Sequence, residues 1–310
     1  MKLYHTERTT IRQVRSLSFK NEKEIQAFVE THLSELFQLE FVRSEMSITS
    51  FRIDTVCFDN ETQSFVIIEY KKDRAFSVVD QGYTYLSLLL NNKADFVLEY
   101  NEKMKKALRR DAVDWSQSRI IFIAPEFTEY QKHSINFKDV PFALWEIQKY
   151  DNGLVSFHEH KTSSGASIST TSNDASGVVK SVSKELVVYT EEFHLHQKSA
   201  PPLPWVLESY TVLRERIVSH GNIDVVPRKL YISFQRDRPV VSIEVQQKAL
   251  KVIINMKKGT LRDPTRLAVD VSGKGHWGVG DYLVVVDKDT DLDALTLLIA
   301  QSHKDKRSSV

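Results

Sequence analysis

The chain has 310 residues, of which 41% are hydrophobic and 27% charged, and its formal net charge is +1 at pH 7. This near-neutral total excludes a histone-like polycation, so any nucleic-acid binding must depend on a local basic patch. The single cysteine, Cys57, excludes an intrachain disulfide and is expected to be a small buried side chain. No apolar run reaches the about 18 residues of a membrane span. We therefore expect a cytoplasmic protein of about two domains.

The first 160 residues alternate between helical and strand patterns. Apolar residues recur at helical spacing from Asn21 to Phe37, which predicts an amphipathic helix with Asn21 as its N-cap. Runs of β-branched and aromatic residues predict strands over 39–48, 52–58, 64–70, 94–100, 119–124, 141–150 and 154–160. Further helices are predicted after Ser77 and over 101–111 and 127–137. This order indicates an α/β domain over residues 1–160, with a mixed central sheet flanked by helices.

A polar stretch divides the chain. Residues 161–181 are rich in Ser and Thr and almost free of large apolar side chains, a composition typical of a flexible linker. Residues 182–310 then predict a smaller α+β domain, which begins with a strand or arm over 182–189. Its other predicted elements are a helix over 204–220, strands over 230–234, 240–245, 250–256, 267–271 and 282–286, and a helix over 292–302.

Acidic and basic side chains converge where two predicted strands meet. A polar turn joins the strands over 52–58 and 64–70, so Asp54 is expected roughly opposite Glu69. Because side chains alternate along a strand, Glu69 and Lys71 share one face. Two carboxylates at a sheet edge form the oxygen-rich site that Mg²⁺ prefers. The alternative is a structural ion pair at the rim of the sheet.

Two helix residues flank this edge. Glu30 lies at the border of the apolar stripe of the first helix, and Gln81 lies in the first turn of the helix that follows Ser77. Both are candidates for the same site. The alternative for each is an ordinary polar residue on a helix surface.

Four blocks of the first domain, in order, resemble the PD-(D/E)XK nuclease superfamily, and within it the branch of the archaeal branched-DNA endonuclease. The blocks read FVETHLSELF from Phe28, RIDT from Arg52, IIEYK from Ile67 and QGYTYL from Gln81. Ile53 stands where the name of the motif has proline, a position that is loose in the superfamily. The resemblance covers residues 22–160 and implies a restriction-endonuclease-like fold.

The resemblance also implies the activity and its cofactor. It implies a metal-dependent endonuclease that hydrolyses phosphodiester bonds, with DNA as its partner and Mg²⁺ or Mn²⁺ as its cofactor. Asp54, Glu69 and the backbone carbonyl of Tyr70 would bind the metal, and Glu30 would assist. Lys71 would orient or help to deprotonate the attacking water.

Gln81 would hold Lys71 or a water molecule in place, again as the resemblance implies. Two other functions stay open: a nuclease fold kept as a DNA-binding or assembly scaffold without turnover, and a sensor gated by a small ligand. The intact set of two acids and a lysine favours the enzyme. The sequence leaves the choice between DNA and RNA open, and a homodimer is one assembly that it allows.

A run of basic residues lies on the helix predicted over 101–111. Its members could follow a phosphate backbone: Lys103, Lys106, Arg109 and Arg110. The alternative is a solvated helix face.

The second domain resembles a C-terminal domain of unknown function that accompanies nuclease-like domains and has been labelled a predicted transport protein. The signature runs from Gly259 to Pro264, through Asp270, and over Gly275–Tyr282. The label has no support, because no segment is suited to span a membrane. Its glycine-rich loop offers a candidate ligand site with His276, Trp277 and Asp281. The alternative is a tight loop in which Trp277 fills the core.

Overall fold

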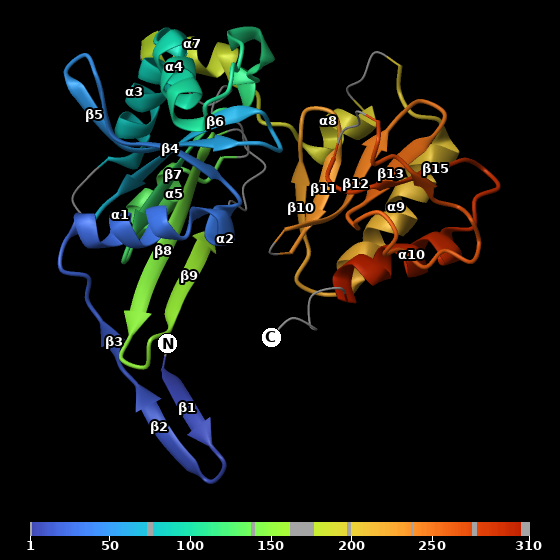
Figure 1. Ribbon diagram of the computed structural model, residues 1–310, viewed down its shortest axis with the longest axis horizontal. Coiled ribbons are helices and arrows are strands. Elements are labelled where there is room, and N and C mark those ends of the chain that lie inside the picture. Colours follow the sequence, from blue (N-terminus) through green and yellow to red (C-terminus); the bar gives the residue numbers. More distant parts are fainter. Residues whose placement is uncertain are drawn as a thin grey trace. The chain divides into compact units, whose positions relative to one another are not determined.

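The computed structural model describes residues 2–72, 77–137, 140–161, 177–196, 200–236, 238–274 and 278–304 (Figure 1). The chain divides into two compact units, Met1–Val188 and Tyr189–Val310. Most of the expected linker lies outside the described residues. The boundary falls after Val188 rather than at residue 182, because helix α7 (Gly177–Glu185) and Leu186 pack into the core of the first unit. The strand or arm expected over 182–189 is therefore wrong.

A mixed seven-stranded sheet forms the centre of the first unit. The strand order is β3 (Ser16–Leu17), β8 (Phe142–Tyr150), β7 (Arg119–Ala124), β6 (Ser64–Tyr70), β5 (Phe51–Asp59) and β4 (Glu40–Ile48), and β9 (Val155–His160) also pairs with β8. Strands β6, β7 and β8 are parallel, and the other pairings are antiparallel. The expected mixed sheet of an α/β domain is confirmed.

Helices cover both faces of this sheet. One face carries α1 (Glu22–Thr31) and α2 (Leu33–Phe37), and the other carries α3 (Val78–Asn91), α4 (Lys93–Met104), α5 (Glu129–Ser134) and α7 (Figure 1). Alternate residues of β6 face the two layers: Ile68 and Tyr70 pack with Val29 of α1, and Ile67 packs with Leu86 of α3. The predicted helix over 21–37 is interrupted at His32.

Two predicted elements were wrong between residues 94 and 111. The strand expected over 94–100 is part of α4, because Phe96 and Tyr100, four residues apart, are both buried on one side of a helix. The helix expected over 101–111 ends at Met104. Asn101 accounts for the ending: its Oδ1 accepts from Leu108 N at 2.6 Å and its Nδ2 donates to Leu108 O at 3.0 Å, which folds the chain back.

Cys57 is fully buried in β5, and burial raises the pKa of its thiol. The expected small buried side chain is confirmed. Cys57 belongs to the first unit, in the apolar cluster under α1.

Gly82 allows α3 to approach β8 closely. A Cβ at this position would lie 2.5 Å from the ring of Phe142, which is itself buried. We expect Gly82→Val to lower the free energy of unfolding by about 1–3 kcal/mol through overpacking, as measured by urea denaturation. In a Phe142→Leu background the same substitution should cost clearly less, and an equal cost in both backgrounds would contradict the packing explanation.

A six-stranded antiparallel sheet forms the second unit. Its order is β10 (Asp224–Pro227), β11 (Ile232–Gln235), β12 (Pro239–Val245), β13 (Leu250–Ile254), β15 (Tyr282–Val286) and β14 (Val269–Asp270). The helices are α8 (Glu191–His196), α9 (Pro204–Ser219) and α10 (Leu292–Lys304), and α10 packs on α9 and the sheet. The five expected strands are present within this sheet; β10 and α8 were not predicted. None of the helices in the described ranges has both the length and the apolar character needed to cross a bilayer.

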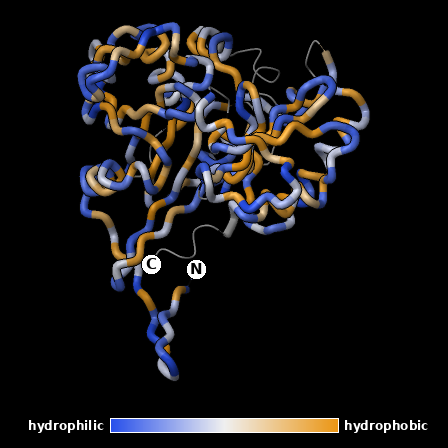
Figure 2. Tube along the Cα trace, turned by 45° about the vertical axis from the view of Figure 1, so that its right-hand side comes forward, coloured by the Kyte–Doolittle hydropathy of each residue, from blue (hydrophilic) through white to orange (hydrophobic). Residues whose placement is uncertain are grey.

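A separate hairpin extends from the first unit. It consists of β1 (Leu3–Glu7) and β2 (Thr10–Val14), which pair only with each other within the described sheets. Figure 1 shows it beyond the end of β8, and Figure 2 shows that its tip is hydrophilic. The turn contains Arg8 with a φ of 48°. Among the ten strand residues, Val14 is buried and Leu3 half-buried, and the others are exposed.

Candidate active site

The pairing of β5 with β6 brings the predicted acidic residues to neighbouring positions. Thr55 lies opposite Ile68, so Asp54 and Glu69 are the next residues toward the end of the ladder. Lys71 follows on the same face as Glu69, and its Nζ donates to Glu69 Oε1 at 2.6 Å. Glu69 is only 2% exposed. The carboxyl end of β6 therefore holds a buried acid in direct contact with a lysine.

Gln81 reaches the same carboxylate from α3. Ser77 caps this helix by accepting from the backbone of its first turn, which places Gln81 over the end of β6. Gln81 Nε2 donates to Glu69 Oε1 at 2.7 Å and lies 3.2 Å from the hydroxyl of Tyr85, one turn later. That hydroxyl donates to the carbonyl of Arg52 at 3.2 Å. The amide of Gln81 is thus fixed between the helix and β5.

Asp54 is anchored by the neighbouring backbone. Its Oδ2 accepts from Tyr70 N at 3.1 Å. Burial raises the pKa of Asp54, although the Tyr70 N–H and the Lys71 charge oppose the shift, and the nearby carboxylates of Glu45 and Glu22 add to it. Asp54 is therefore held in one orientation in surroundings that disfavour its charge.

The surroundings of Glu69 also disfavour its charged form. Burial, followed by repulsion from Asp54, raises the pKa of Glu69 to about 7, and the bonds from Lys71 and Gln81 only partly offset this. Its second oxygen, Oε2, is buried and has no hydrogen-bond partner within the described chain. A buried acceptor without a partner costs about 1–3 kcal/mol. The pair of acids is thus arranged at the expense of stability, as is common at functional sites.

This donor set fits a hard divalent cation. A cation would supply the partner that Glu69 Oε2 lacks and would remove the repulsion between the two carboxylates. Across the described ranges, no group of three or more His, Cys, Asp or Glu side chains is arranged as a complete metal site. The remaining ligands would be the Tyr70 carbonyl, water and substrate oxygens, in keeping with the preference of Mg²⁺ for keeping several waters.

Glu30 makes its contacts elsewhere. Its Oε1 accepts from Gln26 Nε2 at 2.9 Å and from Thr55 Oγ1 at 2.6 Å. Thr55 Oγ1 also lies 3.1 Å from the hydroxyl of Tyr70, on the face that α1 covers. These contacts connect Glu30 to the residue after Asp54 rather than to Glu69, and its part in metal binding stays a prediction.

Gln26 is a site residue that sequence reasoning missed. It is buried, and its Nε2 lies 2.9 Å from the Asp54 carbonyl, Ser44 Oγ and Glu30 Oε1. A signal was present: Gln26 stands beside Ile25 on the apolar side of the helix, four residues before Glu30. A polar residue there needs buried partners.

The predicted basic run is divided into two groups. Lys103 places its Nζ 5.1 Å from the ring centroid of Phe41. Lys106 Nζ lies 3.1 Å from the hydroxyl of Tyr100 and 3.7 Å from a carboxylate oxygen of Glu40. Both lysines are folded onto the protein near the start of β4.

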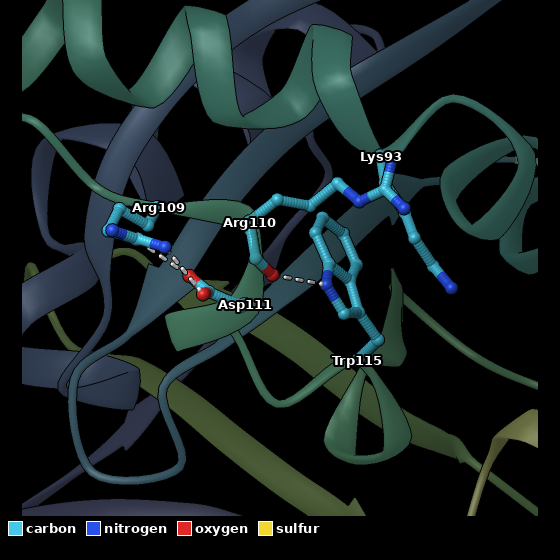
Figure 3. A pocket seen from close by; sticks show the side chains of 5 residues that line it. All are labelled: Lys93, Arg109, Arg110, Asp111 and Trp115. Atoms are coloured by element: carbon cyan, nitrogen blue, oxygen red, sulfur yellow. Dashed lines mark hydrogen bonds and ion pairs between the residues drawn. The ribbon is translucent and has the colours of Figure 1, made fainter.

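Arg109 and Arg110 line a separate hollow of about 520 Å³, together with Lys93, Asp111 and Trp115 (Figure 3). Arg109 forms a two-pronged ion pair with Asp111, with distances of 3.0 and 2.9 Å. Trp115 Nε1 donates to the carbonyl of Arg110 at 3.0 Å. The hollow is therefore rich in cations, two of which are already paired with acids, since Lys93 Nζ also contacts Glu185 Oε2 at 2.6 Å.

The indole in this hollow is engaged by the protein. Phe65 stacks on Trp115 with ring centroids 5.5 Å apart, and the Lys93 ammonium lies 5.5 Å from the indole centroid. The segment is tied to the amino end of β6, because Asp114 N donates to the carbonyl of Gln63 at 2.7 Å. Glu69 is five residues from that end, roughly 17 Å at strand spacing. The hollow and the acid site thus lie at opposite ends of one strand.

The candidate ligand site of the second domain is described only in part. His276 and Trp277 lie outside the described residues. Asp281 accepts from the backbone N–H of Lys258 at 2.8 Å, and its own N–H donates to the carbonyl of Met256 at 3.0 Å. These bonds give Asp281 a role in closing the loop.

Comparison with solved structures gives two weak matches. One is the structure of an EndoMS–dsDNA complex, 18% identical with a TM-score of 0.27, over 39% of this chain and 43% of that chain. The other is a repair endonuclease from Pyrococcus abyssi, 16% identical with a TM-score of 0.22, over 39% and 45%. The chain spans less than half of each of these proteins.

Sequence comparison gives two stronger matches. Residues 196–306 match the family described as Domain of unknown function (DUF5655), which fits the domain of unknown function expected in the second half. A Haemophilus influenzae protein described as uncharacterized is 43% identical over 307 residues, which are 98% of this chain and 100% of that protein. This chain therefore belongs to the same family as the Haemophilus influenzae protein.

Proposed function

We propose that the first unit is a metal-dependent endonuclease that hydrolyses phosphodiester bonds in DNA. One observation carries the proposal: the buried Glu69 carboxylate has Lys71 and Gln81 on one oxygen, no partner among the described residues on the other, and Asp54 beside it. A structural ion pair would not need a second acid or an unsatisfied oxygen. The resemblance of the four sequence blocks to the PD-(D/E)XK superfamily supports the same activity.

Asp54, Glu69 and the Tyr70 carbonyl would hold Mg²⁺ or Mn²⁺. When bound, the cation would lower the pKa of a water molecule and neutralise charge on the phosphate. The backbone N–H that donates to Asp54 Oδ2 fixes the carboxylate of Asp54 in advance, so its orientation does not depend on the cation.

Lys71 and Gln81 have separate roles in this proposal. The Lys71 side chain is 19% exposed, so its ammonium can reach solvent while it contacts Glu69. It would orient the attacking water and stabilise negative charge that develops on the phosphate. Gln81 positions the Glu69 carboxylate, because its amide is itself held by the hydroxyl of Tyr85. We assign the second unit to the selection of substrate or partner.

Cleavage of labelled DNA tests the proposal. Single-stranded, duplex, flapped and mismatched DNAs would each be incubated with Mg²⁺, Mn²⁺ or EDTA. We expect cleavage of at least one substrate that requires metal and is lost in EDTA. Binding without cleavage across the whole panel would contradict the proposed nuclease activity and favour a DNA-binding scaffold.

A further inference from the structure

The hairpin of β1 and β2 combines a bias of positive charge with little burial. We propose that this hairpin enters the major groove of duplex DNA and holds it across the candidate active site. This inference rests on the proposed function, because it names the form of DNA that the site would receive.

The charge of the hairpin supports an anionic partner. Residues 2–15 contain four cationic residues, Lys2, Arg8, Arg12 and Arg15, against the single acid Glu7, which gives a net +3. The whole chain has a net charge of only +1. Arg12 is 78% exposed at the side chain, and its contact with Asp151 is a loose 3.6 Å. These cations are therefore available for phosphate contacts, each of which adds salt-dependent affinity.

Strand pairing places the root of the hairpin at the same end of the sheet as the acid site. Glu69 shares a row of the sheet with Leu144 of β8, and β3 pairs five residues further along that strand, at Lys149, about 17 Å away. Glu146 of β8 pairs with both β7 and β9, so these two strands lie on opposite edges of β8. Lys149 pairs with both β9 and β3, so β3 lies on the same edge as β7. Strand β3 thus continues the edge just beyond the carboxyl end of β7. Because β6 and β7 are parallel, Glu69 and Lys71 lie at this same end.

Hydrogen bonds connect the segment after β3 to the end of β6. The residue after Lys71, Lys72, donates from its Nζ to the carbonyl of Lys20 at 2.8 Å and from its backbone to Glu22 Oε1 at 3.0 Å. Lys20 and Glu22 follow β3 directly in the chain. DNA that lies over the end of β6 and continues along β8 would therefore meet the base of the hairpin.

The dimensions of the hairpin fit a groove. Each strand has five residues, which is about 17 Å of extended ribbon. The major groove of B-DNA, about 12 Å wide, admits a two-stranded β-ribbon. The major groove of an RNA duplex is too narrow for side chains to read, which favours DNA. A two-stranded hairpin is also only marginally stable alone, so a partner that covers it would stabilise it.

The two faces of the ribbon differ. His5 lies opposite Arg12, and on the other face Thr6 lies opposite Ile11. The second face is uncharged and includes Tyr4, 49% exposed, and Ile11, 67% exposed. Such side chains can contact thymine methyl groups on the groove floor while the arginines reach the phosphates. A second copy of this chain is the rival occupant, but two hairpins of charge +3 would repel each other.

A binding experiment in EDTA tests the inference without relying on cleavage. The full-length R8Q/R12Q/R15Q variant would be compared with wild type for a labelled DNA duplex, by fluorescence anisotropy at several salt concentrations. The variant R43Q/K161Q/K184Q is the matched control, since it removes the same charge from exposed positions of the first unit outside the hairpin. Circular dichroism would verify folding of both.

We expect the hairpin variant to bind duplex DNA at least about 10-fold more weakly at 0.1 M salt, with a salt slope smaller by about 2–3. The control should stay within about 2-fold of wild type, and single-stranded DNA should be less affected than duplex. Equal affinities for the hairpin variant and the control would overturn the inference. So would unchanged DNA binding together with loss of a dimer in light scattering, which would assign the hairpin to a second copy. Because EDTA prevents turnover, a failure of the proposed nuclease activity would appear separately in the cleavage assay.

Discussion

Replacing Lys71 with methionine is expected to lower the rate of metal-dependent DNA cleavage by about 10²- to 10⁴-fold. Methionine keeps most of the side-chain volume but removes the ammonium that contacts Glu69 Oε1 at 2.6 Å. The variant should still fold, because Glu69, whose pKa is already about 7, can take up a proton when its cationic partner is lost. Single-turnover cleavage of the preferred substrate would measure the change.

Lys132→Met is the matched control for this substitution. Lys132 also pairs with a carboxylate, that of Glu146 at 3.4 Å, and its side chain is 25% exposed, close to the 19% of Lys71. We expect its cleavage rate to stay within about 3-fold of wild type. Equal rates for the Lys71 variant and wild type would remove Lys71 from the mechanism, and equal losses in both variants would point to a general loss of positive charge.

The second large effect is expected on stability: Glu69→Gln should stabilise the metal-free protein while it abolishes cleavage. The pKa of Glu69 is raised from 4.5 to about 7 in the folded chain, so its favourable contribution is complete below pH 4.5 and is lost as the pH rises through 7. Glutamine removes the cost of burying the charge. We expect a gain of about 1–3 kcal/mol at pH 8 that disappears near pH 4, measured by urea denaturation in EDTA.

Asp59→Asn provides the contrasting variant. Asp59 is also buried, but it is paired with Arg119 at 2.8 Å and accepts from two backbone N–H groups. Neutralising it should destabilise the protein at pH 8. Mg²⁺ should raise the melting temperature of wild type more than that of the Glu69 variant, since only wild type keeps both acids. A loss of stability in Glu69→Gln similar to that in Asp59→Asn would contradict the electrostatic account of the site.

The centre of the candidate site could be predicted from the sequence because local rules determine it. A polar turn between two strand patterns sets Asp54 beside Glu69, and alternation puts Lys71 on the same face as Glu69. The cap at Ser77 fixes the phase of α3 and so directs Gln81 to the end of β6. Each of these steps spans few residues, and the structure brings Glu69, Lys71 and Gln81 into contact.

The errors arose where distant contacts decide the structure. The segment over 94–100 has strand-like composition, yet Phe96 and Tyr100 pack against β5 and β6 as one face of a helix. The end of the first unit depends on Val182 and Leu186 packing against α3, across residues whose composition resembles a linker. The role of Gln26 depends on Ser44 and the Asp54 carbonyl, which no local pattern connects to it.

The burial of Cys57 makes the opening of the first unit measurable by itself. The chain has one cysteine, and it lies in the central sheet under α1, with no exposed surface. A thiol reagent in native buffer can therefore react only when that sheet opens, and the labelling rate reports the free energy of opening. The second unit contributes no thiol to the signal. The natural sequence thus contains a reporter that separates the folding of one unit from that of the other, without any added label.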